Sequence, residues 1–534
     1  MCTSYIKEND VSGRIPHIII LVLHKKNILK TNTIMTKTKR LLLALGIILG
    51  LHAASPTEVL GKAAPRMPLP WDNGNLMVSA NGRFLQFENG QPFFWLGDTG
   101  WLLPERLNRD EAGYYLKHCH EAGFNVVQVQ VLNDVPSFNI YGKMSNPSGW
   151  DLSKADPDGT YSYWDHLDYI IDAAANYGIY IGMVAIWGSQ IKNGHINEAQ
   201  AKTYGQFLAN RYKNRKNIVW IMGGDIEGDI HPEVWNALAT TIKAIDHNHL
   251  MTYHPRGRYT SARWWSKAPW IDFHMFQSGH RRYGQRMGNA FYPIPDSTEE
   301  DNWMYVDSTW SHKPIKPVID GEPSYENTPM GLHDPSEGRW KAADVRRYAY
   351  WSVFAGSCGH TYGHNSIMQM LRPGIATGYG TDGAEKPWYV AMEDSGYNEM
   401  KYLKALMLAM PYFTRIPDQS IVIGNGLRYD RLSATRGNDY LMVYSYRSDR
   451  MKIDLRKITG KKKNLWWMDA ATGTLTFMGT VDNGVHDIRL PKNASEQPGD
   501  GVLIAIDATK EYISKQQTTI LTTKPWVAPR NLNE

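Results

Sequence analysis

The feature that most constrains this chain is a long alternation of apolar and amphipathic segments between residues 93 and 362. Eight short apolar segments are typical of buried parallel strands, and helix-like segments follow most of them. The expected strands are residues 93–97, 124–131, 179–186, 218–222, 250–254, 270–276, 317–321 and 357–362. This number of strands over this length predicts an α/β fold, the (β/α)8 TIM barrel. A doubly wound open sheet would also alternate, but it needs fewer strands, and no glycine-rich phosphate loop follows the first strand.

Signals for helix ends support this alternation. Asn108 is a typical N-cap, Glu111 stands three residues later as in a capping box, and Gly123 is a typical C-terminal residue. The expected helices are residues 107–123, 163–177, 198–212, 232–245, 303–310, 340–354 and 397–410. We therefore expect a barrel domain over residues 70–412.

Different sequence patterns precede and follow the segments that are expected to form the barrel. Residues 76–95 alternate and carry two Asn-Gly turn signals, which predicts a β-hairpin at the start of the barrel domain. After Pro411 the hydrophobic pattern has a period of two, with turns between short segments. This pattern predicts a small antiparallel β-sandwich over residues 415–508. The polar tail, residues 509–534, is expected to be loosely ordered.

Residues 1–54 are typical of a leader that contains a secretory signal peptide. A basic segment, residues 35–40, precedes an apolar run, residues 41–51, and small residues follow. The run is too short to span a bilayer, and Met35 is an alternative start of the chain. We expect an exported protein, periplasmic or secreted, without a stable membrane anchor after cleavage. An uncleaved N-terminal anchor is the alternative.

Charge and cysteine content exclude several classes of protein. The whole chain carries a net charge of +5, but the leader alone carries +6, which leaves the remainder at −1. A near-neutral body does not support a nucleic-acid partner. Of the three cysteines, Cys119 and Cys358 lie outside the leader and are far apart in the sequence. Neither a disulfide framework nor a cysteine metal site is expected.

Polar side chains stand at the carboxyl ends of the expected strands, where barrel proteins carry their reactive groups. The strand that begins at Ile218 breaks at two glycines and then presents Asp225, and another strand end presents Glu322. The other candidates at these ends, or just after them, are Asp98, Gln130, Asn133, Trp187, His254, Arg256, His274, Gln277 and Tyr362. We expect these side chains to lie together at the mouth of the barrel, where the carboxyl ends of the strands meet, and to bind a substrate there.

Two carboxylates beside aromatic residues suit the cleavage of a glycosidic bond. One carboxyl group protonates the departing oxygen, and the other attacks the anomeric carbon or activates water. Asp225 and Glu322 end the fourth and the seventh expected strand, so they would face each other across the mouth. A separation of about 5–5.5 Å would indicate a retaining enzyme, and about 6.5–9.5 Å an inverting one. Glu227, Asp229 and Asp320 are alternative carboxylates.

Other interpretations of these residues stay open. His254 and His274 are either buried structural histidines or metal ligands together with Asp98, although no close His-x-His spacing supports a metal site. Trp187 is alternatively part of the ordinary core. Two basic segments flank the expected mouth and contain Arg256, Arg258, Arg263, His280, Arg281, Arg282 and Arg286. They form either a solvated rim or a site for an acidic sugar, since arginine binds carboxylates with paired hydrogen bonds.

Several short segments resemble the apiosidase-like glycoside hydrolases, glycoside hydrolase family 140. They are Phe94–Trp101, Gly123–Gln128, Trp220–Asp225, Pro317–Pro323 and Gly359–Gly363. Residues 466–473 resemble the C-terminal β-domain of this family, which is described as collagen-binding, and the resemblance covers residues 70–508. The wider clan of retaining barrels usually has Asn-Glu at the end of the fourth strand, where this chain has Gly-Asp.

The resemblance implies a retaining mechanism in which Asp225 is the acid/base and Glu322 is the nucleophile. It also implies action on plant pectin, with cleavage between apiose and the galacturonic acid backbone of rhamnogalacturonan II. The partner would then be a pectic oligosaccharide or polysaccharide, and neither a cofactor nor a metal is implied. A glycosidase of another specificity and a non-catalytic carbohydrate- or matrix-binding protein are the alternatives.

Overall fold

The computed structural model describes residues 68–528 except residues 153–158, 286–298, 333–334, 375–382, 494–496 and 498. The predicted leader, its signal peptide and Arg286 therefore lie outside the described residues. Within the part of the chain that is described, no helix is both long and apolar enough to cross a membrane.

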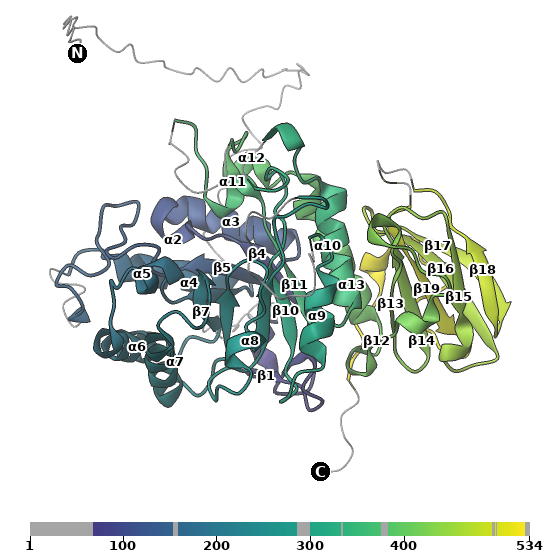
Figure 1. Ribbon diagram of the computed structural model, residues 1–534, viewed down its shortest axis with the longest axis horizontal. Coiled ribbons are helices and arrows are strands. Elements are labelled where there is room, and N and C mark those ends of the chain that lie inside the picture. The colour runs from purple at the N-terminus through teal and green to yellow at the C-terminus, as the bar shows by residue number, and fades with distance from the viewer. Residues whose placement is uncertain are drawn as a thin grey trace, which may run out of the picture. The chain divides into compact units, whose positions relative to one another are not determined.

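The centre of the molecule is a sheet of eight parallel strands in the order β8–β7–β6–β5–β4–β11–β10–β9, with helices outside it (Figure 1). The strands are β4 (Trp95–Thr99), β5 (Val126–Gln130), β6 (Tyr180–Val184), β7 (Ile218–Ile226), β8 (Met251–Pro255), β9 (His274–Gln277), β10 (Val318–Glu322) and β11 (Gly359–Tyr362). The edge strands meet where Asp272 donates its backbone N–H to the Met251 carbonyl at 2.8 Å. The predicted TIM barrel is confirmed.

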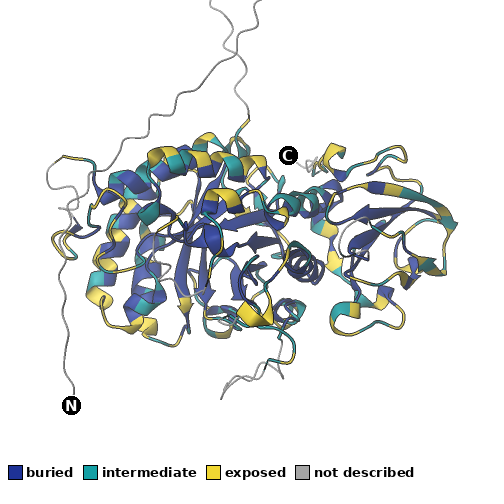
Figure 2. Ribbon diagram, turned by 90° about the horizontal axis from the view of Figure 1, so that it is seen from above, coloured by how far each residue is buried: buried dark blue, intermediate teal, exposed yellow. Residues whose placement is uncertain are grey.

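Helices cover the outside of the barrel, and most of their buried residues face the strands (Figure 2). They are α2 (Leu103–Arg106), α3 (Arg109–Glu121), α4 (Tyr163–Asn176), α5 (Gly188–Lys192), α6 (Glu198–Tyr212), α7 (Pro232–Ile245), α8 (Ala262–Trp265), α9 (Trp303–Trp310), α10 (Ala342–Phe354), α11 (Asn365–Met368), α12 (Trp388–Ala391) and α13 (Ser395–Ala409). Asn108 caps α3 and forms the predicted capping box with Glu111.

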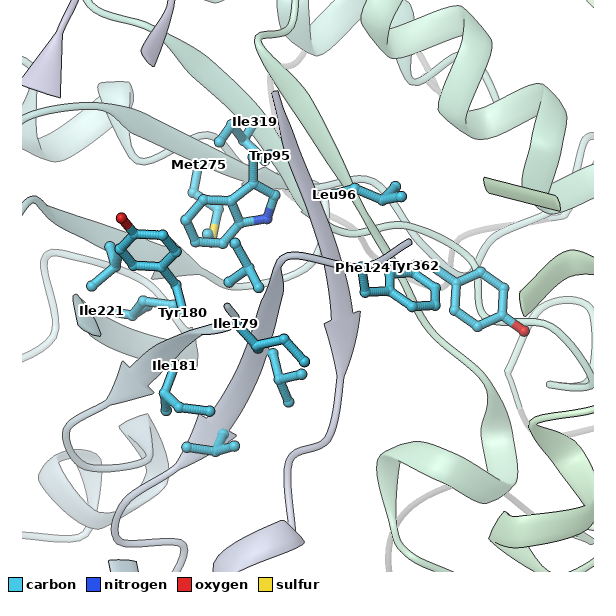
Figure 3. Packing of buried hydrophobic residues seen from close by; sticks show 14 of the residues in the cluster. Trp95, Leu96, Phe124, Ile179, Tyr180, Ile181, Ile221, Met275, Ile319 and Tyr362 are labelled. Carbon is cyan, nitrogen blue, oxygen red and sulfur yellow. The ribbon is translucent and has the colours of Figure 1, made fainter. Parts of the chain in front are cut away.

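Along each strand, side chains alternate between the barrel interior and the layer beneath the helices. Trp95 lies beside Met275 and Ile319 on one side of β4, in the interior of the barrel (Figure 3). The next residue, Leu96, lies on the other side of the strand, as does Tyr362 (Figure 3). This alternation decides which of the predicted site residues can reach the mouth.

A small antiparallel sheet covers the amino-terminal end of the barrel. It contains the strands β1 (Leu76–Val78), β2 (Leu85–Phe87) and β3 (Pro92–Phe93), so the predicted hairpin has a third strand. The Phe93 ring packs edge-on against Tyr180, with ring centroids 5.5 Å apart. Because Tyr180 begins β6, this sheet lies at the end of the barrel away from the mouth.

The C-terminal domain is antiparallel, as predicted. One sheet has the order β12–β13–β14–β19–β16–β17, and the other pairs β15 with β18. The strands are β12 (Ile416–Pro417), β13 (Ser433–Arg436), β14 (Tyr440–Ser445), β15 (Arg450–Asp454), β16 (Lys462–Asp469), β17 (Leu475–Asp482), β18 (Val485–Arg489) and β19 (Gly501–Asp507). Buried Val443, Ile453 and Trp467 belong to one cluster that both sheets share.

The tail differs from its predicted loose order. Residues 509–528 are described, and Ile513 and Ile520 are buried in the main core. Thr519 pairs with Thr474 in an antiparallel bridge, and the Trp526 backbone N–H donates to the Leu408 carbonyl at 2.6 Å. A few apolar residues are therefore enough to fix a mostly polar segment.

Candidate active site

The end of β7 turns Asp225 towards the mouth. Gly223 pairs with His254 and Ile226 pairs with Pro255, so β7 carries two extra residues at this point. Gly223, Gly224 and Asp225 all have positive φ angles, of 86°, 111° and 51°. Glycine adopts these angles readily, whereas a residue with a side chain does so at a cost. The Gly-Gly-Asp sequence therefore allows the turn that presents the carboxylate.

We expect Gly223→Ala to destabilise the fold by about 3 kcal/mol or more, because strain at positive φ adds to a clash. A Cβ at Gly223 would overlap the His254 carbonyl oxygen. Gly194→Ala is the matched control, since Gly194 has a φ of 74° but nothing within 4 Å of its Cβ position. The control should lose only about 1–2 kcal/mol. Equal losses for the two variants in denaturant unfolding would contradict the proposed turn.

A β-bulge at the end of β10 redirects Glu322. Asp320 pairs with Phe276 and Glu322 pairs with Gln277, so β10 has one extra residue there. In regular alternation Glu322 would face the helices, as Asp320 does. The bulge instead turns Glu322 towards the mouth, a role that bulges often have beside active sites.

His254 lies between the two carboxylates. Its Nδ1 accepts a long hydrogen bond from the Asp225 backbone N–H at 3.5 Å, and its Nε2 lies 3.2 Å from Glu322 Oε2. A neutral His254 whose Nδ1 accepts carries its ring proton on Nε2, the nitrogen nearer to Glu322. One imidazole ring thus spans the space from β7 to β10, and the two predicted carboxylates share one mouth.

Three residues around Glu322 were not predicted to contact it or its neighbours, although His280 was placed in a basic segment beside the mouth. His280 Nε2 lies within hydrogen-bond distance of Glu322 Oε1, at 3.1 Å, and the His280 ring packs edge-on against Tyr325. The Trp101 indole donates to the Tyr325 hydroxyl at 3.2 Å and packs against His254. Trp101 and Tyr325 are among the first residues after a strand, and this position could have marked them as candidate site residues in the sequence.

The two carboxyl groups have opposite pKa shifts. The Asp225 side chain is exposed at the mouth, although many protein atoms surround its carboxyl group. Burial raises the pKa of Asp225 to about 6, and repulsion from Glu322 adds to the rise. Burial alone would also raise the pKa of Glu322, but His254 and His280 hold this pKa well below its usual range. At mildly acidic pH the site therefore holds one protonated and one ionised carboxyl group, as acid catalysis with a nucleophile requires.

Aromatic and amide side chains line the remainder of the mouth. Trp187 is half-buried, and its ring centroid lies 5.6 Å from that of Trp101. Gly224 lies directly against Trp187, since a Cβ there would be 2.6 Å from the ring. Gln277 follows inward-facing Met275 by two residues, and its buried Oε1 has no hydrogen-bond partner among the described residues. This oxygen is available to a ligand hydroxyl.

Gln130 and Asn133 lie on and just after β5. Gln128 donates across the barrel interior to the Gly321 carbonyl at 2.9 Å, so Gln130, two residues later, also faces inward and stands at the mouth. Asn133 is partly exposed in the following loop and donates its amide to Asp134 at 3.3 Å.

Asp98, His274 and Tyr362 do not reach the mouth, and the prediction for them is wrong. All three point outward beneath the helices. Asp98 accepts a hydrogen bond from Tyr115 of α3 at 2.6 Å, and burial raises its pKa to about 7. His274 lies 3.1 Å from the Ser261 hydroxyl. Tyr362 donates to Glu326 at 2.5 Å.

Asp98, His254 and His274 do not form the alternative metal site, because Asp98 and His274 face away from His254. The described residues contain no group of three or more His, Cys, Asp or Glu side chains that could hold a metal ion. Among the competing carboxylates, Asp320 is buried and accepts a hydrogen bond from Ser278 at 2.5 Å. Glu227 pairs with Arg256 at 2.6 Å.

Arginine side chains gather beside Asp225. Arg256 follows β8 and is exposed. Burial lowers the pKa of Arg281, and repulsion from Arg258 and Arg256 lowers it further, so these three guanidinium groups lie near one another. The Arg263 guanidinium packs over the Tyr259 ring at 5.3 Å. A cluster of like charges at a mouth favours an anionic ligand.

Comparisons with known proteins agree with this geometry. The family model "Apiosidase-like, catalytic domain" matches residues 79–414, and "Putative collagen-binding domain of a collagenase" matches residues 416–506. No curated protein matches the chain.

Two solved structures are similar over most of their length. One, a glycoside hydrolase, is 60% identical and covers 84% of this chain and 100% of its own, with a TM-score of 0.81. Another, a glycoside hydrolase of family 5 from Bacteroides vulgatus, is 57% identical and covers 85% of this chain and 98% of its own, with a TM-score of 0.82. Since the first family model covers more than half of the chain, the protein belongs to the apiosidase-like glycoside hydrolases.

Proposed function

We propose that this glycoside hydrolase is an exported retaining enzyme that acts on plant pectin. It cleaves the linkage between apiose and the galacturonic acid backbone of rhamnogalacturonan II. The observation that carries the proposal is the pair Asp225 and Glu322, whose carboxyl groups share one mouth and have opposite pKa shifts. The family name and the arginines at the rim support the substrate.

The mechanism assigns one step to each carboxyl group. Glu322, kept ionised by His254 and His280, attacks the anomeric carbon, while Asp225 gives its proton to the departing oxygen. A glycosyl–Glu322 ester results. Asp225, now ionised, takes a proton from water, which attacks the anomeric carbon and releases Glu322. The sugar keeps its anomeric configuration because it is inverted twice.

The rim arginines suit the acidic backbone of the substrate. Arg256, Arg258 and Arg281 lie near one another beside Asp225. A galacturonate carboxylate placed among them would relieve their mutual repulsion and could accept paired hydrogen bonds. Gln277 and Trp187 would bind hydroxyl groups and the apolar face of a sugar ring, respectively.

A product screen tests the proposed substrate. The purified enzyme is incubated with rhamnogalacturonan II and with unsubstituted homogalacturonan, and the products are analysed by mass spectrometry. We expect cleavage of the first polymer, new apiose reducing ends and intact homogalacturonan. Activity on a different polysaccharide alone would show another specificity. Activity that survives in both Asp225→Ala and Glu322→Ala would contradict the catalytic assignment.

The pH profile of kcat/KM should fall above about pH 6. Asp225 acts in its protonated form, so activity is lost as pH rises through its raised pKa. On the acid side, activity is lost only when Glu322 gains a proton, far below the usual range for glutamate. In Glu322→Gln the pKa of Asp225 should fall, because the neighbouring negative charge is gone; carbon-13 NMR of the Asp225 carboxyl measures this. An unchanged pKa would refute the coupling of the pair.

A further inference from the structure

A buried carboxylate, Glu300, joins the barrel to the C-terminal domain. It accepts a hydrogen bond from the Tyr283 backbone N–H at 2.8 Å. Tyr429, in a short 3-10 helix of the C-terminal domain (Arg428–Asp430), donates its hydroxyl to Glu300 at 2.9 Å. Arg347 of α10 donates to the other oxygen of Glu300 at 2.6 Å. One carboxylate thus holds three separate parts of the chain.

The partner of Glu300 is enclosed by rings from both domains. Arg347 is fully buried. Its guanidinium lies within 4.8–5.1 Å of the ring centroids of Tyr348, Trp351, Tyr429 and Tyr446. Removing one member of a buried ion pair is strongly destabilising, because the other charge is left uncompensated. The junction formed by Glu300, Arg347 and Tyr429 is therefore rigid and can hold a neighbouring segment of the chain in place.

The segment held there leads to the mouth. Tyr283 follows His280 by three residues, and His280 contacts Glu322 at 3.1 Å. The C-terminal domain touches Tyr283 twice more: the Arg428 guanidinium lies 4.9 Å from the Tyr283 ring centroid, and the Tyr429 ring packs edge-on at 5.2 Å. Residues 280–283 are thus held by Glu322 at one end and by the Glu300 junction at the other.

We propose that Tyr429 and Arg428 of the C-terminal domain are positioning residues for the active site: they brace residues 280–283 and thereby hold His280 against Glu322. Through residues 280–283, the C-terminal domain then helps to hold the nucleophile Glu322 in position. The role of Glu322 in this inference rests on the proposed function.

The pH profile can report this bracing. Within the described part of the chain, four titratable groups face Glu322: Asp225, His254, His280 and Tyr325. Among them, only His280 belongs to the braced segment. If His280 moves away, Glu322 loses one stabilising contact to its ionised form, its pKa rises, and the acid limb of kcat/KM moves to higher pH.

The test compares Tyr429→Phe, which removes one hydroxyl, with Tyr512→Phe as the matched control. Tyr512 lies in the C-terminal tail and donates to Asp439 of the C-terminal domain at 2.7 Å. Hydrogen exchange of the backbone amides of residues 280–285 is measured by mass spectrometry. We expect exchange about fivefold faster in Tyr429→Phe and no change in the control. Arg428→Ala, at an exposed position, is a second variant with the same expected direction.

A double-mutant cycle completes the test. His280→Gln alone should shift the acid limb, Tyr429→Phe should shift it less, and the two together should shift it no further than His280→Gln. Unchanged exchange, or an additive shift, overturns the bracing of His280. If exchange is faster in Tyr429→Phe but the wild-type protein cleaves no glycoside, the bracing is supported and the proposed function is refuted.

Discussion

Glu322→Gln should lower kcat/KM by on the order of 10⁴-fold or more, because an amide cannot form the covalent intermediate. The fold should survive, since the amide keeps the size of the carboxylate and its oxygen can still accept from one of the two histidines, which lie 3.2 and 3.1 Å from different carboxylate oxygens. Steady-state kinetics on the proposed pectic substrate measure the loss, and thermal unfolding checks the fold.

Two further variants show whether the loss comes from the lost nucleophile. With Glu322→Ala, added azide should occupy the vacant space and give a glycosyl azide of inverted configuration, whereas the wild type should give none. Asp320→Asn is the matched control, since Asp320 lies on the same strand but is buried and faces away from the mouth. A comparable loss of kcat/KM in folded Asp320→Asn would remove the special role of Glu322.

Asp225→Ala should lower kcat/KM by about 10²- to 10⁴-fold on natural substrates, whose leaving group needs a proton. The loss should be much smaller with an aryl glycoside whose phenol leaves without protonation. Azide should then accelerate turnover of the aryl substrate and give a product of retained configuration, because it needs no general base to attack the glycosyl–Glu322 ester.

The matched control for Asp225 is Glu227→Gln, two residues further along the chain. Glu227 pairs with Arg256 at the rim, at 2.6 Å, and so remains outside the chemistry. We expect less than a tenfold change for this variant. Equal losses for the natural and the aryl substrate in Asp225→Ala would mean that Asp225 positions the substrate and does not protonate the leaving group.

The barrel was predictable because its strands and helices are local patterns of hydrophobicity with clear end signals, such as the capping box of Asn108. The strand ends also indicated Asp225 and Glu322. The direction in which a strand-end side chain points was harder to predict. Asp98, His274 and Tyr362 stand on strands like the others, but each faces the helices, so counting residues at strand ends was not enough.

The direction of the Glu322 side chain was also not predictable from its position in the strand. Its position relative to Asp320 gives it an outward direction, and only the bulge in β10 brings it to the mouth. A bulge arises from the pairing of two distant strands, so no local pattern announces it. The contact of His280 with Glu322 and the role of Tyr325 were missed for a related reason, because the path of a loop through space decides which residues reach Glu322.

The circle of strands also has a seam. Among the described residues, β8 and β9 are the two ends of the strand order and share no ladder of paired residues. A few individual contacts join them, among them the hydroxyl of Thr252, which donates to the Phe273 carbonyl at 2.7 Å. His254 and Gln277 lie at the carboxyl ends of the two strands that border this seam, His254 one residue before the end of β8. The segment just after β8 closes this seam at the mouth, since the Arg258 backbone N–H donates to the Gln277 carbonyl at 2.7 Å and the Gln277 N–H donates to the Tyr259 carbonyl at 3.1 Å. On this side Gln277 is therefore fixed by a loop and not by a neighbouring strand.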